Sequence, residues 1–72
     1  MTNSKELMKL IHDQGLKLKF VAEKLGLSPY GLNLKISNKN EFKTSEVAAL
    51  CELLGITSLR EKEKIFFVQK DD

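Results

Sequence analysis

The sequence has little of several features that would point to particular classes of protein. Cys51 is the only cysteine, which excludes an internal disulfide and favours a reducing, intracellular environment. No apolar run approaches the roughly 20 residues that a membrane-spanning helix needs. No signal peptide is visible, because the first residues are polar and then amphipathic. We therefore expect a soluble, cytoplasmic protein with no membrane partner.

The residue types that carry catalysis and metal binding are equally sparse. His12 has no second ligand near it in the sequence, so we expect no metal site. The carboxylates are scattered and are interpreted as exposed, with no confined pair for acid–base catalysis. The glycines stand singly rather than in a phosphate-binding loop. We therefore expect no enzyme, no cofactor and no small-molecule substrate.

The positive charge is concentrated in one part of the chain. The net charge of +2 over 72 residues is too small to indicate nucleic-acid binding by itself. Residues 16–45, however, hold 6 lysines and 2 glutamates, a sum of +4, whereas residues 46–72 sum to −2. This excess favours a surface that meets phosphates or an acidic protein, although solvated lysines explain the charge equally well.

Hydrophobic periodicity predicts five helical segments and a small all-α domain over residues 1–72. The first helix is expected over about residues 4–14, with Asn3 and Glu6 forming a capping box and Gly15 ending it. The sequence shows no repeat, linker or low-complexity tract, which favours a single domain with a core that is only just sufficient.

Two helices are predicted in the second half of the chain. The fourth has Thr44 or Ser45 as its N-cap and ends at Gly55. Its apolar stripe at i, i+3, i+4 and i+7 comprises Val47, Leu50, Cys51 and Leu54. A capping box at residues 58–61 starts the fifth helix or turn. Residues 65–68 then continue that helix, run as a tail or form a dimer surface, and periodicity leaves these alternatives open.

The most informative stretch has the spacing of a helix-turn-helix over about residues 18–37. A helix over about residues 18–25 is followed by Gly26, a tight turn where a side chain would strain the backbone. Ser28 then caps a third helix, with Pro29 preset for its first position. In such a motif the second of the two helices is presented outward for recognition.

This third helix, which is expected to end near Ser37 with a left-handed Asn38 after it, carries two apolar lines. Leu32 and Ile36 share a face and are expected to pack in the core. Leu34 belongs to the other line and lies about 200° around the helix from Leu32. The two lines therefore cannot both face one thin core. The residues turned outward are then Pro29, Tyr30, Asn33 and Leu34.

The outward residues combine a base-reading side chain with apolar ones. Asn33 suits the base edges of the major groove, and Ser28 does so more weakly. Tyr30 can donate one hydrogen bond and stack, whereas Leu34 can contact only a thymine methyl or another protein. An exposed tyrosine and leucine within a positive rim are typical of a protein-binding hot spot. The alternative is that both side chains complete the core.

Residues 21–28 (Val-Ala-Glu-Lys-Leu-Gly-Leu-Ser) and 35–39 (Lys-Ile-Ser-Asn-Lys) carry a family resemblance. The chain resembles the Cro/repressor-type helix-turn-helix family of temperate phages and their bacterial relatives. With Glu41-Phe42 and Phe66-Phe67, it is similar to the small modulator-of-repression antirepressors of lactococcal phages. That resemblance implies a five-helix protein of the bacterial host cytoplasm, which binds the N-terminal DNA-binding domain of a CI-type repressor and tips the lysis–lysogeny switch.

The sequence departs from the DNA-reading pattern of that family at several positions. Lys17 replaces the Ser or Thr that usually caps the second helix, and Leu18 replaces a polar phosphate contact, although burial in the core explains Leu18 as well. Apolar or aromatic residues occupy base-reading positions, namely Pro29, Tyr30 and Leu34. These departures are compatible with a helix-turn-helix directed toward a protein.

Two functions remain open. The chain is either an antirepressor, which blocks operator binding by the phage CI-type repressor and promotes lytic development, or a Cro-like DNA-binding transcriptional repressor. A repressor–antirepressor complex could also sit on operator DNA. Both functions use the same candidate interface: Lys17, Leu18, Ser28, Pro29, Tyr30, Asn33, Leu34, Lys35 and Lys39. In the DNA-binding case, Lys19 and Lys43 are additional phosphate contacts.

Overall fold

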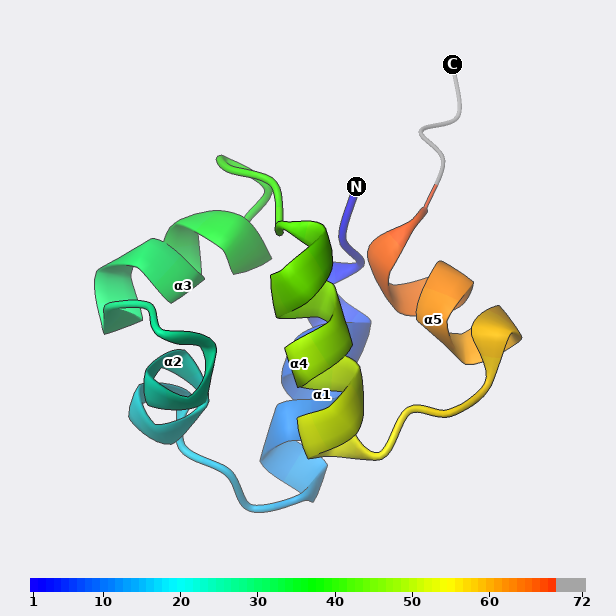
Figure 1. Cartoon of the computed structure of the whole chain (residues 1–72), viewed down its shortest axis with the longest axis horizontal. Helices are drawn as coiled ribbons and strands as arrows, with labels where there is room; N and C mark the ends of the chain where they lie inside the picture. The colour runs from blue at the N-terminus through cyan, green and yellow to red at the C-terminus, as the bar shows by residue number, and fades with distance from the viewer. Residues whose placement is uncertain (69–72) are drawn as a thin grey trace.

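The computed structural model describes residues 1–68, which form five α-helices and contain no strand. The helices are α1 (Ser4–Asp13), α2 (Leu18–Leu25), α3 (Pro29–Ile36), α4 (Thr44–Leu54) and α5 (Leu59–Phe66). Figure 1 shows α4 in the middle of the view, with α2 and α3 on one side and α5 on the other. The predicted all-α fold is confirmed, and no helix in this part of the chain is long and apolar enough to cross a bilayer.

All five helices contribute side chains to one hydrophobic core. Leu7 of α1, Val21 of α2 and Leu50 of α4 are completely buried, and Leu32 of α3 is nearly so. The stripe predicted for α4 is buried in full, which confirms Cys51 as a core residue. Burial raises the pKa of the Cys51 thiol above its ordinary value, because the charged thiolate is disfavoured away from water.

The capping box predicted for α1 is only half formed. The side chain of Asn3 accepts the backbone N–H of Glu6 at 3.2 Å, as expected. The backbone N–H of Asn3, however, donates to the carbonyl of Ile65 at 2.6 Å and not to the Glu6 carboxylate. A hydrogen bond to α5 has therefore replaced the expected local bond to the Glu6 side chain. At α5 the box is also limited to one bond, from the backbone N–H of Glu61 to Ser58 Oγ at 3.4 Å.

The N-terminus of α4 differs from the prediction of a Thr44 or Ser45 cap, which is wrong. Thr44 is the first helical residue, and Lys43 occupies the N-cap position with an extended backbone. Because the lysine side chain cannot accept a hydrogen bond, the cap is formed by a side chain within the helix. The carboxylate of Glu46, three residues later, accepts the backbone N–H of Lys43 at 2.8 Å. This hydrogen bond places the buried carboxylate of Glu46 at the start of α4.

The open question at residues 65–68 is resolved by α5, which continues to Phe66. Ile65 and Phe66 are buried, and the ring of Phe66 meets that of Phe42 edge-on, with 6.0 Å between centroids. A dimer surface is therefore wrong for these two residues, whereas Phe67 and Val68 remain exposed. The rest of the C-terminal segment predicted to reach residue 72 lies outside the described residues.

Candidate functional site

The turn between α2 and α3 is built as the sequence predicts. Gly26 has a φ of +71°, a left-handed conformation that glycine adopts without steric cost. The backbone N–H of Leu27 returns to the carbonyl of Ala22 at 2.8 Å, which closes the end of α2. α2 packs against both α3 and α4. The turn therefore places α3 at the surface with one face toward the core.

The first turn of α3 is capped by local contacts. Ser28 Oγ accepts the backbone N–H of Gly31 at 3.0 Å, and Pro29 is the first helical residue. A Cβ built on Gly31 would lie 3.2 Å from Ser28 Oγ, which is a tight approach. Sequence reasoning did not account for Gly31, whose lack of a side chain leaves room for this cap.

The outward face of α3 begins immediately after the cap. Tyr30 is 74% exposed, and Pro29, which precedes it, and Asn33, three residues later, are also exposed. Core packing of Tyr30, the alternative left open above, is therefore wrong. The prediction that Leu34 faces fully outward is corrected, because its side chain is half-buried. A helical leucine leans back along the preceding turn, so part of its surface can be covered even at an outward position.

The C-terminal end of α3 is held by long-range hydrogen bonds. Asn38 has the predicted left-handed φ, +65°. Its side-chain amide accepts the backbone N–H of Thr2 at 2.8 Å and donates to the carbonyl of Thr2 at 2.9 Å. The hydroxyl of Ser4 donates to the carbonyl of Ile36. These bonds tie the end of α3 to the N-terminal segment, from which it is separated by more than 30 residues.

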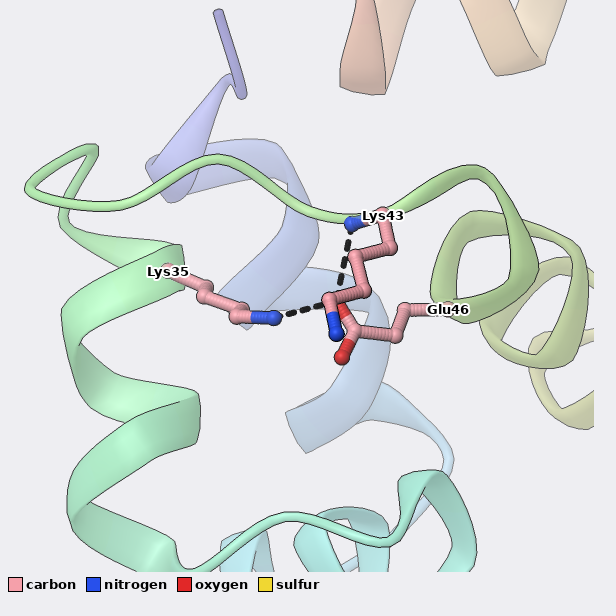
Figure 2. Close-up of polar contacts among 3 residues, drawn as sticks. All are labelled: Lys35, Lys43 and Glu46. Atoms are coloured by element: carbon pink, nitrogen blue, oxygen red, sulfur yellow. Dashed lines mark hydrogen bonds and ion pairs between the residues drawn. The ribbon is translucent and has the colours of Figure 1, made fainter.

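An ion pair adds a second attachment at the same end of α3. Figure 2 shows the Lys35 ammonium and the backbone nitrogen of Lys43 meeting the carboxylate of Glu46. The Lys35 Nζ to Glu46 Oε1 distance is 2.5 Å, and the two side chains are only 11% and 9% exposed. Lys35, predicted as a free phosphate contact, is therefore already paired. The prediction that all carboxylates are exposed is wrong for Glu46.

The surroundings of Glu46 favour its charged form. Burial by itself raises the pKa of a carboxylate, because a charge is costly away from water. Here the hydrogen bonds from Lys35 and from the backbone of Lys43, with the positive charges of both lysines, outweigh burial and hold the pKa of Glu46 below its ordinary value. Glu46 is thus a carboxylate at neutral pH and a fixed countercharge beside α3.

Comparison with protein-family models decides which family has this arrangement. The model of the Cro/C1-type HTH DNA-binding domain matches residues 6–59, well over half of the chain and including α2, α3 and α4. The chain belongs to this family. Searches of curated proteins and of solved structures gave no significant match. The general resemblance to Cro/repressor-type regulators is thereby confirmed.

The remaining predicted interface residues of this Cro/C1-type domain lie near the start of α2 and after α3. Lys17 is exposed at the N-cap of α2 and provides no side-chain cap, whereas Leu18 is half-buried against the core. Lys39 is exposed beyond the end of α3. The exposed lysines of residues 16–45 are Lys17, Lys19, Lys24, Lys39 and Lys43. Lys35 is the lysine of this stretch that is not fully exposed.

One partly exposed aromatic side chain on α2 was missed by the sequence reasoning. Phe20 is 40% exposed, and the ammonium of Lys24 lies 5.4 Å from its ring centroid. The i, i+4 spacing of a lysine after an aromatic residue was the available signal. His12 is exposed, and no cluster of three potential metal ligands occurs within residues 1–68.

Proposed function

We propose that this Cro/C1-type domain is a Cro-like DNA-binding transcriptional repressor that presents the first turns of α3 to the major groove. The observation that carries the proposal is the family match over residues 6–59, which includes an α3 whose early residues are exposed. Recognition helices of this type contact base edges with their N-terminal residues. In this protein those residues are the ones left free of intramolecular packing.

The roles of individual residues follow from their chemistry. Asn33 is suited to pair with the N6 and N7 atoms of adenine, and Tyr30 can donate one hydrogen bond or stack. The exposed Lys17 and Lys39 would meet phosphates on either side of the groove. Symmetric operators are bound by dimers of such domains, and Phe67 offers an exposed apolar residue for that contact.

Selection of binding sites from a random duplex library, followed by titration at several salt concentrations, tests this proposal. A sequence preference is expected, and Asn33→Ala should reduce it by about 1–3 kcal/mol at one base pair. Lys39→Met should lower the salt slope by about 0.9, because one phosphate contact is lost. Lys64→Met, at an exposed position of α5, is the matched control and should leave the slope unchanged. Binding without any sequence preference would contradict the proposal.

A second candidate function, that of an antirepressor, is favoured by the exposure of Tyr30. An aromatic ring that is 74% exposed beside an exposed Pro29 gives little hydrogen-bonding capacity for bases. It provides instead the kind of anchor that protein interfaces bury. In this function the same surface docks on the N-terminal DNA-binding domain of a phage CI-type repressor, blocks its operator binding and shifts the switch toward lytic growth.

Calorimetric titration with such a repressor domain, in parallel with duplex DNA, separates the two functions. In an antirepressor, Tyr30→Ala should cost about 2 kcal/mol or more of binding free energy. The control Leu59→Ala, which removes a side chain that is 69% exposed on α5, should cost nothing. Tight repressor binding with only non-specific DNA binding would establish the antirepressor. Specific DNA binding with no repressor complex would exclude it.

A further inference from the structure

The Lys35–Glu46 pair distinguishes one lysine of the helix-turn-helix from the others. Among residues 1–68 it is the sole ion pair, and its two side chains come from α3 and from the first turn of α4. Lys35 is 11% exposed in its side chain, whereas Lys39, four residues later, is exposed. The charge of Lys35 is therefore neutralised within the molecule.

We propose that Glu46 is a positioning residue of the interface, which keeps Lys35 away from DNA phosphates and fixes the end of α3 against α4. The proposal rests on the DNA-binding function proposed above. It assigns a role to a side chain outside the helix-turn-helix itself. It also implies that the surface attracts phosphates with one positive charge fewer than the sequence provides.

The two bonds made by Glu46 explain why Lys35 would stay paired on DNA. The same oxygen, Oε1, accepts the Lys35 ammonium and the backbone N–H of Lys43. If Lys35 turned to a phosphate, a largely buried carboxylate would lose its charged partner. Breaking a buried pair in this way is costly, because the remaining charge is left uncompensated. Exposed lysines can reach phosphates without that cost.

The first test is the salt dependence of duplex binding by Glu46→Gln. The amide retains an oxygen acceptor for the Lys43 N–H but loses the charge that holds Lys35, whose long stem can then carry its ammonium into solvent. The expected result is a salt slope steeper by about 0.9, with tighter binding at low salt. Glu41→Gln, the matched control, removes an exposed carboxylate and should leave the slope unchanged. An unchanged slope in Glu46→Gln, or an equal increase in both variants, would overturn the proposal.

A second variant tests the same claim by changing Lys35 instead of Glu46. Lys35→Met should leave the salt slope at the wild-type value, because the wild-type ammonium makes no phosphate contact. Lys39→Met, the matched control, should lower it by about 0.9. If Lys35→Met lowers the slope as Lys39→Met does, Lys35 leaves Glu46 on binding, and the proposal is wrong.

A measurement on the unmodified protein keeps this test independent of DNA binding and of the folding of any variant. Acylation by an amine-reactive ester, followed by mass spectrometry, should modify Lys35 several-fold more slowly than Lys39. Equal rates would overturn the pairing on which the proposal depends. If the wild-type protein binds no duplex even at low salt, the proposed function and the DNA role of Glu46 both fail. Slow acylation of Lys35 would in that case still establish the pair.

Discussion

The two ends of α3 are built in different ways. At its start, Ser28 caps the helix with a local hydrogen bond, and Tyr30 stands 74% exposed. At its end, Lys35 is paired with α4, and Asn38 is bonded twice to the N-terminal segment. A short helix can therefore be fixed at one end and available for contact at the other. Long-range contacts hold its end, so its beginning can be presented to a partner.

The largest expected effect comes from the inner face of α3, which both ends share. Leu32→Ala should lower the free energy of unfolding by about 2–5 kcal/mol, because it removes a side chain that is only 1% exposed and leaves a cavity. Urea denaturation followed by circular dichroism measures this. Leu59→Ala, a leucine at an exposed position, is the control and should change stability by less than about 0.5 kcal/mol. Equal effects would contradict the described core.

The anchored end of α3 can be weakened at Asn38. Asn38→Ala should cost about 2–3 kcal/mol of unfolding free energy, because both hydrogen bonds to Thr2 are lost and alanine must adopt a positive φ. Asn38→Gly loses the same bonds but tolerates that φ, so it should cost about 1 kcal/mol less. Thermal unfolding of the two variants separates the terms. If alanine is no worse than glycine, the left-handed conformation contributes nothing.

Acid should loosen the same end of α3 through Glu46. Its pKa is lowered in the folded state, so its contribution to stability is present above the ordinary carboxylate pKa and is lost as the pH falls through the lowered folded value. Urea unfolding measured from pH 7 down to about pH 3 should therefore show a smaller acid-dependent loss in Glu46→Gln than in the wild type. Glu41→Gln, at an exposed position, should retain the wild-type profile.

The presented end of α3 should show the smallest effect on stability. Tyr30→Ala should change the unfolding free energy by less than about 0.5 kcal/mol, because the ring is largely in solvent. The same variant should weaken binding to DNA or to a repressor. Tyr30→Phe separates the two contributions, since it keeps the ring and removes the hydroxyl. A strongly destabilised Tyr30→Ala would show that the start of α3 is not free.

The same contrast explains how much the sequence could predict. The beginning of α3 follows from neighbouring residues, so the cap at Ser28, the turn at Gly26 and the exposure of Tyr30 were predictable. All five helical segments were predicted for the same reason, the fifth as a helix or a turn, since periodicity and most helix-ending residues are local signals. The residues proposed for the interface remain predictions.

The end of α3 could not be predicted, because its partners are distant in the sequence. Asn38 could be expected to end the helix, but its bonds to Thr2 depend on how α1 packs. Lys35 resembles any surface lysine until Glu46 is placed beside it by α4. The start of α4 was misassigned because Glu46, not a Ser or Thr, completes its first turn. Side-chain pairing across the fold is what sequence patterns leave undetermined.

The difference between the two ends of α3 is tested most directly by mapping backbone amide chemical shifts of the wild-type protein as a selected DNA duplex is added. The largest changes should fall at residues 28–33, at the presented start of α3. The amide of Thr2, which donates to the Asn38 side chain at the anchored end, should change little. Changes centred on α5, or loss of the Thr2–Asn38 pairing on binding, would contradict a fixed end and a presented start of α3.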